Sequence, residues 1–193
     1  MFTERIAVIQ GRAKVLHTLA LLFLASNWLG LAGDFLTQNG EVSYLAVLLY
    51  LITIPVGIAS LLFVSQWTKS LMETSRLIQP EGFGYRQGWS FWAWVTPVMS
   101  FWVPKRLVDN TYLIFRDYVG VEKTLNVSKW WGYFVASSIV GLISSPSEGA
   151  FAFNYFFALI STVLLTLAFP LWKEVVTEVT AAQVEALEKL ELA

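Results

Sequence analysis

Five long runs without a charged side chain are the feature that most restricts how this chain can fold. They cover residues 15–33, 42–68, 87–104, 130–147 and 149–172, with 19, 27, 18, 18 and 24 residues. An α-helix needs roughly 20 mainly apolar residues to cross the hydrocarbon core of a bilayer. A soluble fold of 193 residues could not bury so much apolar surface. The runs therefore predict an all-α, multi-span integral membrane protein.

Composition narrows the classes of function. The net charge of −1 gives no basic bias, so we expect no nucleic-acid partner. Without cysteine, the chain has no disulfide and no thiolate metal ligand, and its one histidine, His17, fits the interfacial start of the first span. We expect no cofactor and no metal, and no catalytic set of residues stands out, so the chain is not expected to be an enzyme.

One of the five runs differs from the others. It belongs to WSFWAWVTPVMSFWVPKR, residues 89–106, in which Pro97 must bend any continuous helix. We predict four spans at about 15–36, 42–66, 130–147 and 150–172 within a single membrane domain, 1–193. Residues 89–118 then form a re-entrant or interfacial segment, with a short fifth span as the alternative. Because the run 15–33 is longer than the roughly 7–15 apolar residues of a signal peptide, we expect it to be an uncleaved span.

The distribution of basic residues favours a hairpin, in which residues 89–104 enter and leave on the same side of the membrane, over a fifth span. If residues 89–104 return to the side from which they came, all thirteen Lys and Arg residues lie in the same-side segments 1–14, 67–129 and 173–193. A fifth span would move five of them, from Lys105 to Lys129, to the other side. The positive-inside rule then predicts a multi-pass protein of the cytoplasmic membrane, with both termini cytoplasmic.

The hairpin also supplies the candidate contact residues. Indole rings prefer the membrane interface, so its tryptophans are either belt anchors or a surface on which a ligand stacks. Lys105 and Arg106 are either lipid-phosphate ligands or ordinary juxtamembrane anchors. Residues 107–118 have helical spacing of polar residues and predict an amphipathic interfacial helix. The candidate lipid or ligand contacts are Trp67, Trp89, Trp92, Trp94, Pro97, Ser100, Trp102, Pro104, Lys105 and Arg106.

Two further patterns predict how helices pack. Ser137, Gly141 and Ser145 recur every four residues and form a small-residue face, either for packing within the chain or for a homodimer. After Pro170, residues 173–193 predict a cytoplasmic helix with an apolar stripe (Val175, Val179, Ala182, Ala186 and Leu190) and five glutamates elsewhere. This tail can pair with the 67–88 region, with itself or with a partner.

The segment from Trp67 to Arg106 resembles the bacterial membrane family called domain of unknown function 4328. The residues that carry the resemblance are Trp67, Gly88, Trp89, Trp92, Trp94, Pro97 and Pro104. Where the family pattern has asparagine, this chain has Ser100, and Ser70 and Leu71 stand where a second asparagine is expected. The resemblance implies a bacterial inner-membrane protein of unassigned activity.

These observations lead to two hypotheses of function. In the first, a non-catalytic membrane protein associates with membrane lipids, a membrane-protein partner or a second copy through its Trp-rich cytoplasmic hairpin. In the second, a small facilitator or channel for a neutral or hydrophobic solute is lined by the hairpin and the bent second span at Pro55, with Asn27 and Ser100 beside the cavity. The absence of charge within the spans disfavours ion-coupled transport.

Overall fold

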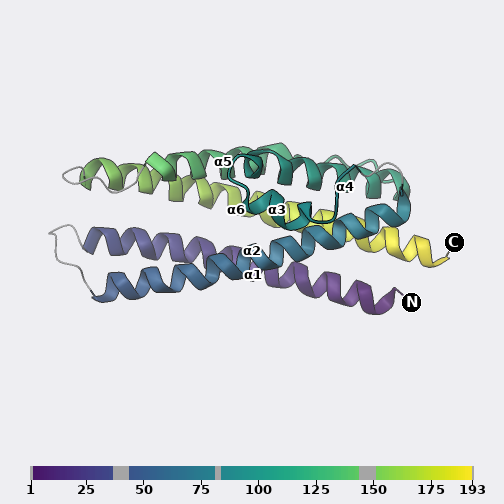
Figure 1. Cartoon of the computed structure of the whole chain (residues 1–193), viewed down its shortest axis with the longest axis horizontal. Helices are drawn as coiled ribbons and strands as arrows, with labels where there is room; N and C mark the ends of the chain where they lie inside the picture. Colours follow the sequence, from purple (N-terminus) through teal and green to yellow (C-terminus); the bar gives the residue numbers. More distant parts are fainter. Residues whose placement is uncertain (1, 37–43, 81–83, 144–150, 193) are drawn as a thin grey trace. The chain divides into compact units, whose positions relative to one another are not determined.

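The computed structural model describes residues 2–36, 44–80, 84–143 and 151–192, and every regular element among these residues is a helix. The prediction of an all-α protein is therefore confirmed. Figure 1 shows the six α-helices and one 3-10 helix of the described residues: α1 (Thr3–Leu36), α2 (Tyr44–Ile78), α3 (Trp89–Val95), η1 (Met99–Phe101), α4 (Val103–Val119), α5 (Val127–Ile143) and α6 (Phe151–Leu192).

Three of the described helices, α1, α2 and α6, are long and apolar enough to cross a membrane. Four such helices were predicted. The fourth predicted span, 130–147, corresponds to α5, whose described part is 17 residues long. A helix of that length rises about 25 Å, which is at the lower limit for crossing the hydrocarbon core. Residues 144–147 of the predicted span lie outside the described residues.

The long helices extend beyond the predicted spans. Helix α1 begins at Thr3, and α6 is one helix of 42 residues that passes through Pro170. The tail 173–193 was predicted to be helical after Pro170, and its described residues are helical, as the last part of α6. Proline removes one backbone hydrogen bond, but no glycine accompanies it in α6 and most neighbouring residues are good helix formers. Helix α2 likewise continues through Pro55.

The chain divides into two compact units. The charged unit comprises Met1–His17, Leu61–Ser128 and Lys173–Ala193, and the apolar unit comprises Thr18–Ser60 and Lys129–Trp172. Twelve of the thirteen Lys and Arg residues belong to the charged unit, and Lys129 is the first residue of its segment in the apolar unit. Four of the five uncharged runs therefore lie mainly in the apolar unit, whereas the run 87–104 lies in the charged unit, and α1, α2 and α6 each contribute to both units.

In the apolar unit, α5 packs against the first part of α6. The hydroxyls of Ser137 and Ser161 each donate to the other residue's carbonyl oxygen at 2.9 Å, and the indole rings of Trp130 and Trp172 lie 4.8 Å apart. A Cβ atom added to Gly141 would lie 3.2 Å from Oγ of Ser161. The small-residue face thus serves packing within the chain, and its third member, Ser145, lies outside the described residues.

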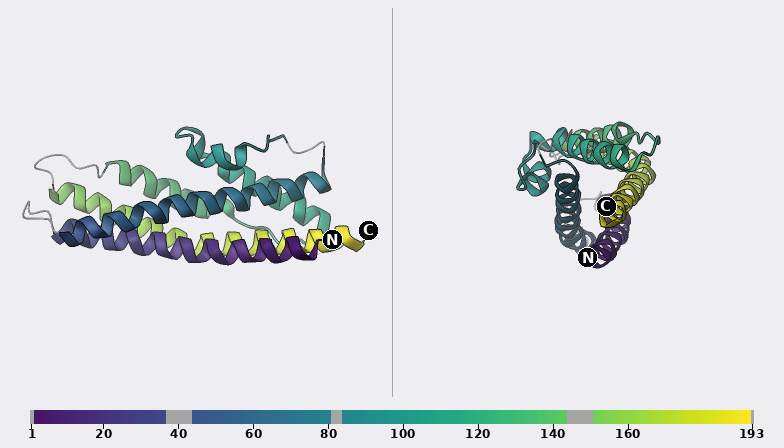
Figure 2. Two further views of the ribbon diagram at one scale, coloured as in Figure 1. Left: turned by 60° about the horizontal axis from the view of Figure 1, so that its bottom comes forward. Right: turned by 90° about the vertical axis from the view of Figure 1, so that its right-hand side faces the viewer.

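In the charged unit, the two ends of the chain lie side by side (Figure 2), and the backbone N–H of Phe2 donates to Glu191 at 3.3 Å. The N-terminal part of α1 is antiparallel to the last part of α6, because His17 in turn lies 3.4 Å from Thr177. The last part of α2 is parallel to α6, since Trp67 contacts Thr180 and, further along both helices, Thr74 contacts Gln183.

The same unit contains α4, whose apolar side faces the protein. Its buried residues recur every three or four positions and are Val103, Pro104, Leu107, Val108, Thr111, Tyr112 and Phe115. At its C-terminal end, Lys189 of α6 donates to the carbonyl oxygen of Tyr118 at 2.7 Å, where the helix dipole favours a cation. Gly120 ends α4 with φ of 88°, a backbone conformation that glycine adopts without strain. The predicted amphipathic helix exists, and the protein itself covers its apolar side.

The packing of α5 on α6 can be tested with two glycines of one helix. Gly141→Leu should lower the thermal stability of the detergent-solubilised protein, by about 1–3 kcal/mol, because the new side chain overlaps Ser161. Gly132→Leu is the control, because no atom lies within 4 Å of a Cβ added there. Equal melting temperatures for the two variants would contradict this packing.

Candidate functional site

The segment 88–104, which we continue to call the hairpin, consists of α3, a turn, η1 and the start of α4, and its shape follows from its two prolines. Thr96 precedes Pro97, and its ψ of 115° is extended, as the residue before a proline prefers, so α3 ends after seven residues. Pro104 lies in the first turn of α4, where its missing N–H costs nothing. Between them, the backbone N–H of Ser100 donates to Thr96 at 2.8 Å, which closes the turn. The segment is thus not one continuous helix.

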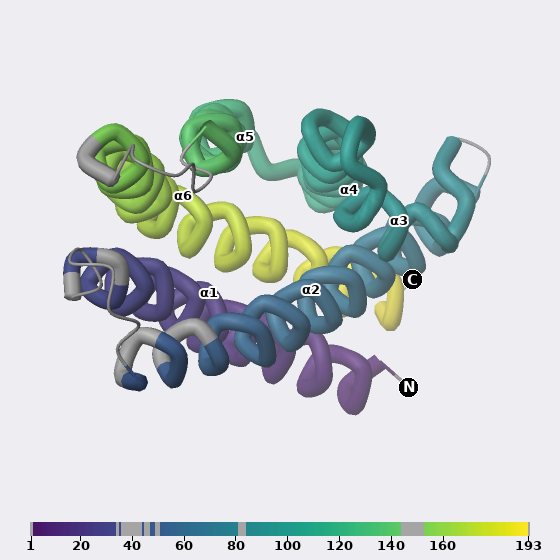
Figure 3. Tube along the Cα trace, turned by 60° about the vertical axis from the view of Figure 1, so that its left-hand side comes forward, coloured from purple at the N-terminus to yellow at the C-terminus, as the bar shows by residue number. Residues whose placement is uncertain are grey.

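One side of the hairpin packs on α2, as Figure 3 shows for α3. Ser90 and Ala93 of α3 are buried. The indole N–H of Trp94 donates to Oγ1 of Thr68 at 3.2 Å. Thr68 is the last residue of the uncharged run 42–68, and Lys69 is the first charged residue after it. The contact therefore attaches the hairpin to α2 at the position where this helix first bears charge.

The other side of the hairpin is exposed and apolar. Trp92 has 58% of its side chain exposed, Val98 63% and Trp102 42%. The exposed large apolar residues of α3, the turn and η1 are Trp92, Val95, Val98, Met99, Phe101 and Trp102, and we call this set the hairpin patch. No charged residue occurs between Arg86 and Lys105. Patches of this kind mark contacts with a partner or a membrane.

The structure divides the other candidate contact residues by environment. Trp67 and Pro104 are buried, whereas Trp89 and Ser100 are partly exposed. Pro97 is exposed, and its carbonyl oxygen accepts the hydroxyl of Ser100 at 2.8 Å.

The two basic candidates also differ. Lys105 forms an ion pair with Asp109 at 3.2 Å, and Arg106 is exposed. Of the ten candidates, Trp92 and Trp102 belong to the hairpin patch, and the buried residues hold the unit together instead.

A buried polar cluster joins α2 to α6 beneath the hairpin. The indole N–H of Trp67 donates to Oγ1 of Thr180 at 3.2 Å. The side-chain amide of Gln183, which is fully buried, donates to both oxygens of Ser70 at 3.0 Å and to Thr74 at 2.9 Å. The tail therefore pairs with the 67–88 region, the first of the predicted alternatives. Sequence reasoning missed Thr180 and Gln183, although they are uncharged on a tail rich in glutamate.

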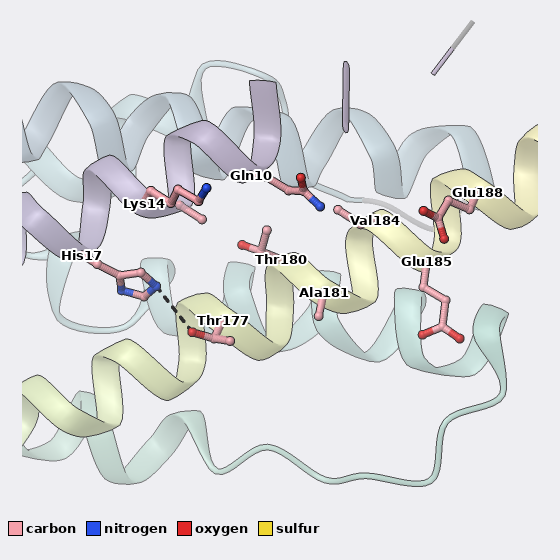
Figure 4. A pocket seen from close by; sticks show the side chains of 10 residues that line it. Gln10, Lys14, His17, Thr177, Thr180, Ala181, Val184, Glu185 and Glu188 are labelled. Carbon is pink, nitrogen blue, oxygen red and sulfur yellow. Dashed lines mark hydrogen bonds between the residues drawn. The ribbon is translucent and has the colours of Figure 1, made fainter. Parts of the chain in front are cut away.

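A groove of about 750 Å³ lies in the charged unit between α1 and α6 (Figure 4). Its two ends differ in charge, because Lys14 and His17 line one end while Glu185 and Glu188 line the other. Ala13 and Ala181 are small, which leaves space between the helices. The remaining lining residues are Gln10, Thr177, Thr180 and Val184. No part of this groove was predicted from the sequence.

The end of α4 and the connector that follows it are held to α6 by polar contacts. The hydroxyl of Tyr112 donates to the carbonyl oxygen of Lys123 at 3.0 Å, and Lys123 forms an ion pair with Glu178 at 2.7 Å. Burial raises the pKa of Tyr112, and the charge of Glu178 raises it further against the opposite effect of Lys123 and Arg116. The hydrogen bond to Glu178 raises the pKa of Lys123.

The residues named for a solute pathway fall in both compact units. Pro55 and Asn27 belong to the apolar unit, whereas Ser100 belongs to the charged unit. The side-chain amide of Asn27 donates to the carbonyl oxygen of Phe23, one turn earlier in α1, at 2.7 Å. This internal bond satisfies one of its donors.

A family model described as Domain of unknown function (DUF4328) matches residues 36–189 of the chain. No curated protein and no solved structure matches this chain significantly.

The buried cluster predicts a stability effect at one hydroxyl. Thr180→Val keeps the shape of the side chain but leaves the buried indole N–H of Trp67 without its acceptor, so unfolding should become easier by about 1–3 kcal/mol. Thr124→Val, at an exposed position in the connector after α4, is the control. Thermal denaturation in detergent measures both, and an unchanged Thr180→Val protein would show that the indole contact contributes nothing.

The raised pKa of Tyr112 predicts a loss of stability in alkali. Because the pKa of Tyr112 is higher in the folded chain, the neutral phenol favours folding. This contribution to stability is complete below the pKa of the unfolded chain, about 10, and is lost as the pH rises through the pKa of the folded chain. Tyr112→Phe removes both the hydrogen bond and the titration. Its melting temperature should therefore lie below that of the parent near pH 8, and the difference should narrow above pH 10. A constant difference across that range would contradict the assignment.

Proposed function

Because the chain belongs to the domain of unknown function 4328 family, to which no activity is assigned, we propose its function from the hairpin patch. The protein is a non-catalytic, multi-pass protein of the bacterial inner membrane. It associates with the lipid of the cytoplasmic leaflet by inserting the hairpin patch into the headgroup layer. The rest of the charged unit stays in the cytoplasm.

The topology of this proposal has four spans at about 15–36, 42–66, 130–147 and 150–172. Helices α1, α2 and α6 have the length and apolar character that three of them require. Helix α5 is proposed as the fourth because an even number of crossings leaves all thirteen Lys and Arg residues on one side. That side is cytoplasmic by the positive-inside rule, and both termini lie there.

The observation that carries the proposal is the position of the exposed tryptophans relative to the end of an uncharged run. Trp94 bonds to Thr68, immediately before the first charged residue of α2 beyond its span. A helix leaves the hydrocarbon at such a position, so the hairpin lies at the depth of the headgroups. Indole rings are enriched at this depth because the ring is apolar while its N–H prefers water. Trp92 and Trp102 meet these conditions, being exposed and attached at this depth.

Insertion of apolar side chains, rather than attraction to anionic lipid, supplies most of the affinity in this proposal. Only Lys105 and Arg106 are basic at the end of the hairpin, and Lys105 is already paired with Asp109. Recognition of anionic lipid by charge ordinarily uses about four to eight clustered basic residues. The association should therefore depend little on salt.

Single cysteines test the proposal, because the natural sequence contains none. Trp92→Cys and Val98→Cys, each labelled with an environment-sensitive fluorophore in nanodiscs, should give blue-shifted emission that brominated lipid quenches. Glu122→Cys is the matched control, since Glu122 is exposed in the connector after α4. Its label should remain in water, and a membrane-impermeant thiol reagent added to whole cells should not reach it.

Hairpin labels that behave like the label at position 122 would refute lipid insertion. Reaction of the residue 122 thiol from outside the cell would refute the four-span topology. The two results are independent of each other.

A further inference from the structure

The groove between α1 and α6 is open along its length. Six of its ten lining residues are exposed, and Ala13 and Thr180 are buried at its floor. Small-molecule sites ordinarily enclose about 70–90% of the ligand surface. An open groove between two helices does not do this, whereas it can hold an elongated occupant such as a third helix.

The size of the groove agrees with a helix as occupant. From Thr177 to Glu188, α6 rises about 16 Å. A helix about 10 Å across, half sunk along that length, displaces on the order of 600–700 Å³. The groove has about 750 Å³. Ala13 and Ala181 permit the close approach that such packing needs.

The charges of the groove indicate which helix fits. Lys14 and His17 lie at the end of the groove nearest the first span, and Glu185 and Glu188 lie at the opposite end (Figure 4). Both glutamates are exposed, so they interact with an occupant in a partly hydrated setting where charge mainly sets specificity. An occupant must therefore present basic groups beside Glu185 and Glu188.

A second copy of this chain does not satisfy that requirement, a step that rests on the membrane topology proposed above. Two copies in one membrane are related by an axis along the membrane normal, so equivalent residues lie at equal heights. Glu185 and Glu188 of one copy would face the same residues of the other, and Lys14 would face Lys14. Like charges opposed in this way disfavour the contact.

We propose that this groove binds a juxtamembrane helix of a different protein, one that presents basic side chains beside Glu185 and Glu188 on the cytoplasmic side of its membrane span. The hairpin patch contacts lipid, and the groove on the same unit selects a protein partner. The two surfaces are chemically distinct, because one is uncharged and the other carries both signs.

Photocrosslinking from an exposed position that lines the groove tests the proposal. The full-length protein with Ala181→p-benzoyl-phenylalanine is expressed in its native host, and irradiation of intact cells should yield one predominant adduct with another protein. Mass spectrometry of the crosslinked peptide should identify a helix-forming segment with Lys or Arg within about two turns of the crosslink. The segment should directly follow or precede an apolar span.

Charge reversal establishes that the groove is the contact. Glu185→Lys with Glu188→Lys should abolish the adduct, and acidic substitutions of the basic residues in the identified peptide should restore it. Glu122→Lys with Glu174→Lys is the control, because it makes the same change of net charge at exposed positions outside the groove. Equal melting temperatures of the two double variants verify that both are folded.

Every other outcome overturns the proposal. These outcomes are adducts with lipid alone, adducts with a second copy of this chain, no adduct, and an adduct that survives reversal of Glu185 and Glu188. Failure here is distinguishable from failure of lipid insertion, because the fluorophores on the hairpin report on the membrane whether or not the groove is occupied.

Discussion

The cost of placing charge in hydrocarbon is the constraint on which the rest of this structure depends. A charged side chain at the centre of a bilayer costs several kcal/mol, so a chain that crosses repeatedly must keep its charges between the crossings. Here the uncharged run in α1 begins directly after Lys14, and that in α6 ends directly before Lys173. The division of the described structure into two units falls within a few residues of the same two lysines. The charge distribution and the packing thus place the boundary between the apolar unit and the charged unit at nearly the same residues of α1 and α6.

Where helices continue beyond the hydrocarbon, they are stabilised by contacts with each other that include polar side chains. In the proposed topology, water replaces lipid around the helices of the charged unit, and the core between α2 and α6 contains hydroxyls and an amide as well as apolar groups. Two hydrogen bonds connect the groove to the hairpin through α2. Thr180, which lines the groove, accepts the indole N–H of Trp67. Thr68, the next residue of α2, accepts the indole N–H of Trp94 in the hairpin. Since Trp67 and Thr68 are consecutive in α2, the groove and the hairpin are attached to the same turn of one helix. A shift of that turn would move both surfaces together.

The sequence allowed the elements to be predicted better than their contacts. Pro97 and Pro104 determine where α3 ends and α4 begins, because proline acts through local backbone geometry that needs no knowledge of neighbours. The tail stripe was predicted correctly at Val175, Val179 and Ala186, which are buried, but the prediction omitted Gln183, also fully buried. A hydropathy pattern assigns a glutamine to the exposed side of a helix. Gln183 is buried because Ser70 and Thr74 of α2 accept hydrogen bonds from its amide, and these partners are not evident from the local sequence.

The tryptophans show the same limit more sharply. The three tryptophans are chemically identical, and Trp92 and Trp94 are only two residues apart. Even so, Trp67 is in the core, Trp92 is exposed, and Trp94 donates a hydrogen bond at the edge of the hairpin. Which face of a short helix turns inward depends on residues far away in the chain, and no local pattern contains that information. The groove could not be predicted for the same reason, since it arises where Ala13 of one helix meets Ala181 of another, 168 positions later.

The hairpin patch and the groove between α1 and α6 have different proposed roles, affinity for the membrane and selection of a protein partner. Burial of large apolar side chains provides free energy without selecting a partner, as is appropriate for a contact with lipid. Exposed charges contribute little affinity in water but discriminate strongly between partners. For two proteins confined to the same membrane, the groove faces a partner at high effective concentration, so a contact that would be weak in solution is sufficient. A membrane protein whose cytoplasmic unit is held at the bilayer surface by one face can therefore use a shallow, polar groove on another face for recognition, where a soluble protein would need a deep apolar one.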